Sequence, residues 1–316
     1  MASEPELDAL QRAAEQRLFE VYGLSYTERF VEAVGTSIRV VEVAGDPSKT
    51  PVLLLHGIAA VTAAAVPLIP AFDGAPVIAI DWPGHGLSGP FPFTRHTDLR
   101  AFAVEIIDTV MADVTEPFDI VAHSLGGQFA LYYCLTRQER VQRLVLLGAP
   151  GAAFPELKPP ASMRLLAFPG FGAGILSRVV PLEQYRANSG MTLGKGTVDA
   201  WPVELVEVGW YASQRKAFAE TLPGLFSSIA SVFGVRRSAV ISHAELATIT
   251  IPVLLVWGTE DVFMSPETGR PSWSRMPRAQ LVELRDANHA PWLNKPDEAA
   301  AAVRAFLTPP ASSQVE

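Results

Sequence analysis

A serine stands between small residues in the stretch FDIVAHSLGGQFA, which covers residues 118–130. Apolar residues before Ser124 suit a buried strand and those after it suit a helix, so the serine would lie at the apex of a strand–turn–helix. Such a turn requires small residues two positions before and after the serine; Gly126 is the smallest possible, and Ala122 adds one methyl group. Free N–H groups and the dipole at the helix start favour negative charge beside the hydroxyl. The stretch predicts a nucleophilic serine, which needs a base to remove its proton.

Strands and helices alternate along most of the chain around this serine. Continuous apolar runs typical of strands buried on both faces are PVLLLHG (51–57), PVIAIDWPG (76–84), FDIVAHS (118–124), RLVLLGAPG (143–151), IPVLLVWG (251–258) and AQLVELRDANH (279–289). Helical patterns occupy 99–114 and 126–138, and alternating segments around Gly35 predict an antiparallel edge hairpin. This order predicts an α/β fold: a mostly parallel twisted sheet with right-handed crossovers and helices on both faces.

The alternation stops between residues 151 and 247. This stretch is rich in proline and glycine and contains apolar patches such as MRLLAFPGFGAGIL, but no strand repeat. The strand pattern resumes at Ile251. We therefore expect residues 1–150 and 248–316 to form one core, with 151–247 inserted after the sixth strand as a mostly helical cap, or lid.

Five short motifs that follow successive predicted strands resemble those of the α/β-hydrolase superfamily, in its serine-nucleophile, esterase-like members with a helical cap. They are HGI (56–58), DWPGHGLS (81–88), AHSLGG (122–127), GTED (258–261) and NHAP (288–291). Each motif alone is weak, but their order and their placement after strands make the combination specific. The resemblance covers most of the chain outside the insertion, and it implies the α/β-hydrolase fold.

The resemblance also implies roles for individual residues. The family's chain order of nucleophile, acid and histidine corresponds to Ser124, Asp261 and His289. The oxyanion hole would use the backbone N–H groups of Ile58 and Leu125. His289 would take the Ser124 proton as the hydroxyl attacks a carbonyl, while Asp261 would hold the imidazole in the required tautomer. Water would then attack the acyl-enzyme.

Two positions near the histidine depart from the family pattern. Many relatives carry an acidic residue shortly after this histidine and before a proline, where this chain has Asn294, Lys295 and Pro296. The glycine that often precedes the histidine is replaced by Asn288. Neither change removes a catalytic atom, but the anchoring of the segment would differ.

Other residues compete for each role. An ordinary helix N-cap is the alternative for Ser124. The remaining histidines are His56, His85, His96, His123 and His243; His289 is preferred because it alone follows the last predicted strand. The alternatives to Asp261 are Glu260, Asp286, which lies very near His289 in the chain, and a position after the sixth strand, where GAPGAAF offers no early carboxylate.

Composition excludes several classes of partner. The chain has 316 residues, is 49% hydrophobic, and carries 25 Lys and Arg against 33 Asp and Glu, for a formal charge of −8. No basic stripe favours nucleic acid or an anionic membrane surface. Residues 57–72 are short for a membrane span and contain Pro67 and Pro70, so we expect a loop and a buried helix. An acidic amphipathic amino terminus without an apolar signal core, and a single cysteine, Cys134, predict a cytoplasmic protein.

No pattern in the chain predicts a metal or a cofactor. The glycines between Gly170 and Gly174 follow no predicted strand, and SGMTLGKGT lacks both the first glycine and the final Ser or Thr of a phosphate-binding loop. No group of His, Cys or carboxylates has metal-ligand spacing. We expect Cys134 to be an inert packing residue.

The predicted function is a serine hydrolase that cleaves an ester, or a similar activated carbonyl, of a small hydrophobic substrate. The apolar residues of the insertion could surround a hydrophobic acyl or alcohol group of the substrate, or they could only pack the lid on the sheet. Both interpretations stay open. Candidates for contact with substrate are His123, Trp292, Phe168 and Phe171. Carbon–carbon bond hydrolysis, lactone opening and perhydrolysis use the same triad, and a non-catalytic ligand-binding homologue is a further alternative. A serine nucleophile argues against haloalkane dehalogenases and epoxide hydrolases, whose nucleophile is an aspartate. The sequence does not predict an oligomeric state.

Overall fold

The structure is a computed structural model that describes residues 2–159, 161–166, 170–176, 178–193, 198–199 and 201–308. Within these residues, eight strands form one sheet in the order β1-β2-β4-β3-β5-β6-β9-β10. Their bounds are β1 Thr27–Ala33, β2 Thr36–Val43, β3 Val52–Leu55, β4 Val77–Ile80, β5 Phe118–His123, β6 Val141–Leu147, β9 Val253–Gly258 and β10 Ala279–Leu284. β2 runs antiparallel to β1 and β4, and the other neighbouring pairs are parallel. The predicted mostly parallel sheet and the antiparallel hairpin at its edge are confirmed.

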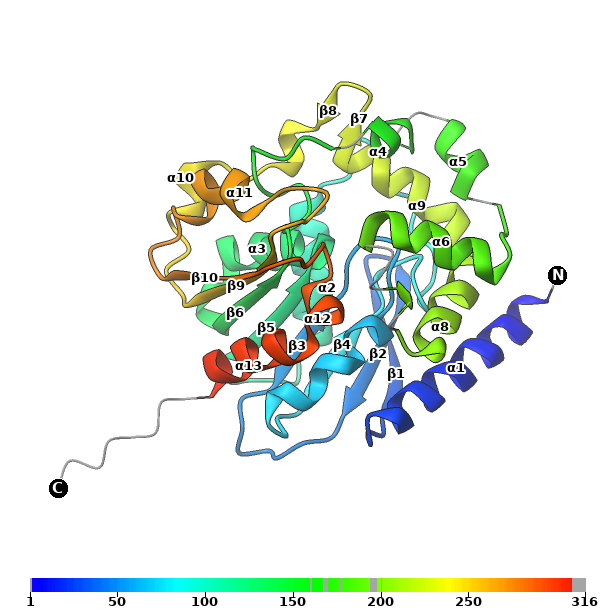
Figure 1. The fold of residues 1–316 in the computed structure, drawn as a ribbon, viewed down its shortest axis with the longest axis horizontal. Helices are drawn as coiled ribbons and strands as arrows, with labels where there is room; N and C mark the ends of the chain where they lie inside the picture. Colours follow the sequence, from blue (N-terminus) through cyan, green and yellow to red (C-terminus); the bar gives the residue numbers. More distant parts are fainter. Residues whose placement is uncertain are drawn as a thin grey trace.

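The central strands are apolar throughout because helices cover both faces of the sheet (Figure 1). Every residue of β3 and β9 is buried. On one face lie α2 (Leu99–Val110) and α3 (Leu125–Arg137), which pack in one hydrophobic core with side chains of β3, β5 and β6. On the other face lie α1 (Glu4–Val21), the 3-10 helix η1 (Thr62–Phe72) and α13 (Pro296–Leu307). The loops at the carboxyl ends of the parallel strands are therefore left to build a site.

Local sequence explains where these helices begin. Asp98 caps α2 by accepting hydrogen bonds from the backbone N–H groups of Arg100 and Ala101. The helix ends at Val110, earlier than the predicted 114, and its buried residues recur at helical spacing; they are Leu99, Phe102, Ala103, Ile106, Ile107 and Val110. The buried helix expected between 57 and 72 is η1, whose tighter winding accommodates Pro67 and Pro70.

The segment between β6 and β9 is mostly helical, with one short hairpin that the sequence did not predict. Its elements are α4 Ala161–Leu166, α5 Phe171–Leu176, α6 Leu182–Leu193, α8 Val203–Ser213, α9 Lys216–Ile229, β7 Ala230–Ser231, β8 Gly234–Val235, η3 Arg237–Ala239 and α10 His243–Leu246. Three short elements complete the fold: η2 Gln138–Arg140, α11 Pro266–Trp273 and α12 Pro291–Asn294. In Figure 1 the helices α4, α5 and α9 gather with the hairpin at one end of the molecule.

Among the described residues, the segment between β6 and β9 contacts the rest of the chain at several places, of which two involve its helices α8 and α9. Helix α1 packs along α8, and the two lie side by side in Figure 1. Helix α9 lies against the loop that follows β4, where Thr221 Oγ1 accepts a hydrogen bond from the backbone N–H of Phe91 at 3.0 Å. A Cβ atom on Gly84 would lie 2.2 Å from the Thr221 side chain, so only glycine permits this contact. Helix α9 therefore lies against the loop at the carboxyl end of β4.

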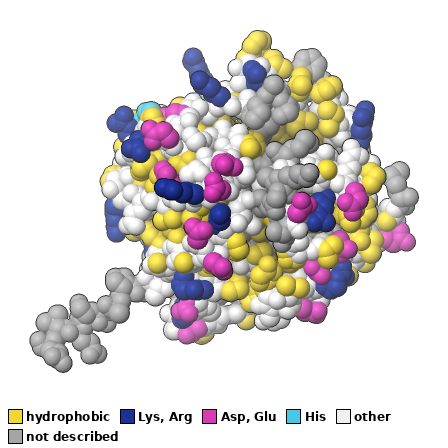
Figure 2. Space-filling view, viewed as in Figure 1, with side chains coloured by type: hydrophobic (Ala, Val, Ile, Leu, Met, Phe, Trp, Pro, Cys, Tyr) yellow, Lys and Arg dark blue, Asp and Glu magenta, His cyan; other side chains and the backbone are white. Residues whose placement is uncertain are grey.

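The surface shows no separation of charge by sign on the described part of the face drawn in Figure 2, where acidic and basic side chains are interspersed. Apolar side chains lie at the top of that view, over the β7–β8 hairpin and the neighbouring helices; Phe233, at the hairpin tip, is 95% exposed. Among the described helices, none has both the length and the apolar character needed to cross a bilayer.

Candidate active site

The predicted turn around Ser124 is present between β5 and α3. Ser124 has φ +51° and ψ −114°, a backbone conformation that residues other than glycine rarely adopt. A Cβ atom on Gly126 would lie 2.3 Å from the backbone oxygen of Leu55, so the first turn of α3 can approach β3 only with glycine there. Ala122 is fully buried between β3 and β6, where its methyl group is accommodated. The strained turn presents the serine at the end of the sheet.

The Ser124 side chain does not cap α3, since it makes no capping hydrogen bond with the helix. A Cβ atom built on Gly57 would lie 3.0 Å from Ser124 Cβ, which places the loop after β3 beside the serine. Within the described residues, the backbone N–H groups of Ile58 and Leu125 donate to no protein acceptor. Two free donors near a hydroxyl are what an oxyanion hole requires.

His289 and Asp261 are in direct contact, although 28 residues separate them. Nδ1 of His289 lies 2.9 Å from Oδ2 and 3.0 Å from Oδ1 of Asp261. Because a carboxylate only accepts hydrogen bonds, Nδ1 is the donor, and Nε2 of a neutral imidazole carries the free lone pair. Both side chains are buried: Asp261 is 7% exposed and His289 is 4% exposed.

Three further donors hold the Asp261 carboxylate. The backbone N–H of Ala149 donates to Oδ2 at 2.9 Å, the indole N–H of Trp257 donates to Oδ2 at 3.1 Å, and the backbone N–H of Phe263 donates to Oδ1 at 3.0 Å. Burial by itself would raise the pKa of Asp261, but the neighbouring His289 and these hydrogen bonds outweigh it, so the pKa lies below its ordinary value. Asp261 is therefore ionised at neutral pH.

The loop that carries His289 is anchored by Asn294. Its side-chain oxygen accepts a hydrogen bond from the backbone N–H of Asn288 at 2.9 Å. This bond closes the loop directly before the histidine, so the Asn294 amide supplies an acceptor from the segment that departs from the family pattern. In this structure, and among the described residues, no hydrogen bond joins Ser124 Oγ to His289. Such bonds are often long or poorly aligned until substrate binds.

The rival residues lie elsewhere or have other partners. Glu260 and Asp286 are exposed, and the backbone N–H of Asp286 bonds to Thr259. His96 accepts from Arg95, and His243 pairs with Glu156. The rings of His56 and His85 are buried within the loops after β3 and β4. Of the described carboxylates, Asp261 is the one in contact with His289.

Residues 52–303 match the model of the alpha/beta hydrolase family. The chain belongs to the alpha/beta hydrolase family. This hydrolase is 29% identical over 264 residues to the pimeloyl-[acyl-carrier protein] methyl ester esterase of Neisseria meningitidis serogroup B, covering 81% of this chain and 92% of the relative.

Solved structures agree on the fold. Carboxylesterase CesB from Bacillus subtilis matches with a TM-score of 0.75 at 19% identity, over 96% of this chain and 98% of that chain. The 2-hydroxy-6-oxo-6-phenylhexa-2,4-dienoate hydrolase from Rhodococcus sp. strain RHA1 matches with a TM-score of 0.73 at 24% identity, over 89% and 98%. The predicted α/β-hydrolase fold is confirmed.

The residues predicted to contact substrate in this hydrolase are dispersed. The His123 ring lies 4.7 Å from the rings of both His289 and Trp292, and Nε2 of His123 donates to the His289 carbonyl at 3.0 Å. Trp292 is 2% exposed, and its indole N–H donates to the carbonyl of Ala64 at 2.8 Å. His123 thus packs between His289 and Trp292. Contact of His123 or Trp292 with substrate stays a prediction.

The aromatic and aliphatic residues of the insertion divide into two groups. Phe171 is 49% exposed at the start of α5, and Phe168 lies outside the described residues. Phe226 belongs instead, with Phe218 and Leu222, to a hydrophobic cluster on α9, against which Ile58 and Leu176 pack. The cluster therefore contacts the residue that carries one of the two free backbone donors.

Two residue patterns were not recognised from sequence. The first is the role of the segment after β6, where Ala149 donates to Asp261 and a Cβ atom on Gly148 would lie 2.5 Å from the His289 carbonyl. Gly148 has φ +67°, a left-handed conformation that favours glycine. Glycines near prolines are common in loops, so Gly148 alone did not predict a contact with the histidine loop. The second is Trp257. In an apolar strand its indole is expected to be an ordinary core side chain, and the sequence does not show that it donates to Asp261.

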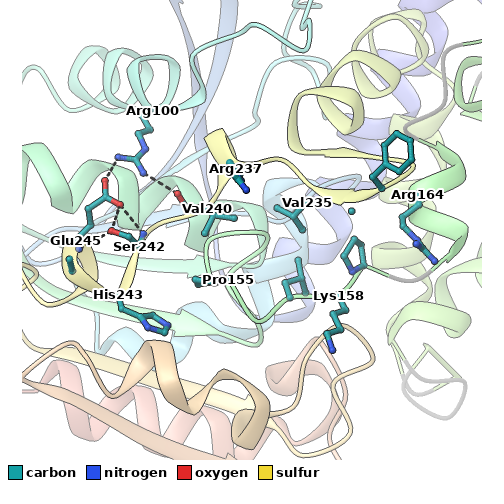
Figure 3. A pocket seen from close by; sticks show the side chains of 15 residues that line it. Arg100, Pro155, Lys158, Arg164, Val235, Arg237, Val240, Ser242, His243 and Glu245 are labelled. Atoms are coloured by element: carbon teal, nitrogen blue, oxygen red, sulfur yellow. Dashed lines mark hydrogen bonds and ion pairs between the residues drawn. The ribbon is translucent and has the colours of Figure 1, made fainter.

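A surface groove lies apart from this site (Figure 3). Its lining includes Arg100, Lys158, Arg164, Arg237 and His243, and none of Ser124, Asp261 or His289. Arg100 is already bonded to Glu245 and to the carbonyl of Val240. Among the described residues, no group of three or more His, Cys, Asp or Glu is arranged to hold a metal ion.

Proposed function

We propose that the protein is a serine hydrolase that cleaves carboxylic esters through an acyl-enzyme. The observation that supports the proposal is the buried Asp261–His289 pair at the same edge of the sheet as Ser124. Ser124 lies in a strained turn, and its side chain does not cap the following helix. A buried carboxylate on Nδ1 leaves Nε2 as the base, which is the arrangement that serine hydrolysis needs.

In this mechanism Ser124 Oγ attacks the ester carbonyl carbon and its proton passes to Nε2 of His289. The carbonyl oxygen becomes an oxyanion that accepts hydrogen bonds from the backbone N–H groups of Ile58 and Leu125. Asp261, ionised and held by four donors, stabilises the imidazolium. The imidazolium protonates the leaving alcohol, and a water molecule then releases the acid by the same steps in reverse.

The substrate class that fits best is a small ester with an apolar group. The α9 cluster of Phe218, Leu222 and Phe226 packs against Ile58, so an apolar surface adjoins the proposed oxyanion hole. The named activity of the curated relatives, a methyl ester esterase, also supports an ester. We propose that residues 151–247 form the cap that supplies this surface, while 1–150 and 248–316 form the catalytic core. The proposed compartment is the cytoplasm, which fractionation of the expressing cell tests.

Labelling with a fluorophosphonate probe tests the nucleophile. The wild type should be labelled and should hydrolyse p-nitrophenyl esters, while Ser124→Ala should do neither. Ser265→Ala is the matched control, because Ser265 is an ordinary helix N-cap that bonds to the N–H of Thr268. A folded wild type that the probe does not label would refute the enzyme and favour a ligand-binding role.

The remaining assignments need two more measurements. His289→Ala should lower kcat by several powers of ten, as removal of a triad member does; near-normal turnover would assign the base to another histidine. Methyl and p-nitrophenyl esters graded by acyl length, with Ser124→Ala as the blank, would define the substrate. Rates that do not depend on acyl length would remove the α9 cluster from the proposal.

A further inference from the structure

The proposed oxyanion donor Ile58 lies in a tight turn with an unusual backbone. The turn covers residues 57–60 and is closed by a hydrogen bond from the backbone N–H of Ala60 to the carbonyl of Gly57 at 3.2 Å. Its third residue, Ala59, has φ +57°. Turns of this kind usually place glycine there, because a side chain in the left-handed region costs about 1–2 kcal/mol. Something outside the turn must therefore hold Ala59 in this conformation.

The first of two imidazoles that hold the turn is His56. Its Nδ1 lies 2.7 Å from the Gly57 carbonyl and its Nε2 accepts from the backbone N–H of Trp82 at 3.1 Å, so Nδ1 is the donor. The Gly57 carbonyl and the Ile58 N–H belong to one trans peptide and point in opposite directions. Fixing that carbonyl fixes the direction of the Ile58 N–H.

The second imidazole is His85, which holds the next peptide. Nε2 of His85 accepts a hydrogen bond from the backbone N–H of Ala59 at 3.0 Å, and Nδ1 donates to the carbonyl of Pro83 at 3.0 Å. These opposite partners require the neutral tautomer with its proton on Nδ1. The side chain is fully buried, and burial, followed by the proximity of the His56 imidazole, lowers the pKa of His85 to about 3. His85 thus remains an acceptor across the pH range of an assay.

The surroundings of His85 leave it little freedom. Its ring lies 5.2 Å from the ring of His56 and meets the ring of Phe218 on α9 edge-on at 6.2 Å. Gly84, directly before it, has φ +75° and packs on Thr221 of the same helix. His85 is therefore clamped between the loop after β3 and the insertion.

We propose that His85 is a positioning residue for the oxyanion hole: by accepting the Ala59 N–H, it keeps the 57–60 turn in the one conformation that aims the Ile58 N–H at the developing oxyanion. The inference rests on the proposed function. His85 contacts neither Ser124 nor the reacting atoms by this account. Its effect should appear in the transition state, where the oxyanion exists, and not in the binding of the ground-state ester.

Three substitutions separate the hydrogen bond from the packing of the ring. The amide oxygen of His85→Gln can take the place of Nε2, so this variant keeps the acceptor. His85→Asn is polar but too short to reach Ala59, and His85→Phe keeps the ring without an acceptor. His96→Phe is the control, since His96 is an exposed histidine outside the site. Thermal unfolding confirms that each variant is folded.

The measurements are kcat and KM for a p-nitrophenyl ester and Ki for a trifluoromethyl ketone, whose adduct with Ser124 places an oxyanion in the hole. His85→Phe and His85→Asn should lower kcat and weaken the ketone by about ten- to a hundredfold, the range expected when a catalytic group is misplaced by about 1 Å. KM should stay within about twofold. His85→Gln should recover most of both losses, and His96→Phe should match the wild type.

Each other result overturns the inference. Wild-type kcat and Ki in all three variants would show that the turn holds itself. Losses in His85→Asn and His85→Gln but not in His85→Phe would assign the effect to ring packing, and equal losses in all three would show that an acceptor at residue 85 does not restore the turn. A parallel rise of KM and Ki would show a general loss of binding. If His85→Phe does not fold, the comparison of Gln with Asn decides the same question. A wild type that fluorophosphonate does not label would refute the proposed function itself, whereas a labelled wild type with unchanged His85 variants would refute only this inference.

Discussion

Replacement of Asp261 by asparagine tests the site most directly, because the change removes one oxygen and little volume. Oδ2 of Asp261 accepts from two fixed donors, the Ala149 N–H and the Trp257 indole, as well as from His289. The one remaining oxygen of asparagine should turn toward those two donors. Its NH2 group would then face His289 and the Phe263 N–H. Nδ1 of His289 could pair with it only as an acceptor, which moves the imidazole proton to Nε2.

An imidazole with its proton on Nε2 cannot take the proton of Ser124. We therefore expect kcat of Asp261→Asn to fall by about 10⁴, the loss typical of this exchange in a serine triad. That factor corresponds to about 5.5 kcal/mol of transition-state stabilisation. Placing one N–H against another in a buried site should also lower the free energy of unfolding by about 1–3 kcal/mol.

Ester hydrolysis under saturating substrate measures the first quantity, and urea unfolding measures the second. Asp286→Asn is the control, because Asp286 is exposed and does not contact His289. A kcat of Asp261→Asn within about tenfold of the wild type would contradict the tautomer argument. Loss of activity in Asp286→Asn instead would assign the acid to the other carboxylate.

The same variant makes a prediction about pH. The pKa of Asp261 is lower in the folded protein than its ordinary value. Its carboxylate therefore contributes stability above the unfolded pKa of about 3.9, and this contribution is lost as the pH falls through the folded value. Since asparagine does not titrate, the stability advantage of the wild type over Asp261→Asn should shrink below about pH 4. An advantage that stays constant between pH 7 and pH 3 would show that the carboxylate gains nothing from its partners.

Three further predictions concern packing and buried charge. Gly126→Ala would place a Cβ atom 2.3 Å from the Leu55 backbone oxygen, so the free energy of unfolding should fall by about 1–3 kcal/mol in urea titrations, together with loss of labelling at the serine. Arg39→Met should lower the free energy of unfolding by about 3–5 kcal/mol, because the buried Glu15 carboxylate loses its partner at 2.6 Å. Adding Glu15→Gln should restore part of that loss, and additive effects of the two substitutions would contradict the pairing. Cys134 is buried, which raises its pKa to about 12, so the thiol should react with a disulfide reagent only after unfolding, and rapid reaction of the native protein would contradict its placement.

Much of the architecture follows from local patterns. Continuous apolar runs predicted the parallel strands because a strand covered on both faces has no polar side. Glycine two residues after the serine predicted the turn because β3 leaves no room for a Cβ atom there. The β7–β8 hairpin was not predicted, since each strand has two residues and is too short for an alternating pattern.

Residue types and their order determined that this chain builds an α/β sheet with a serine at a strand–helix turn and a histidine after the last strand. Only the tertiary structure decided which carboxylate contacts that histidine, and that Asn294 closes its loop. It also decided that His85 accepts the Ala59 N–H, 26 residues away in the chain. Burial and turn formation depend on neighbours along the chain, so a sequence shows them. Hydrogen-bond partners that lie far apart in sequence become neighbours only when the sheet aligns the carboxyl ends of its strands.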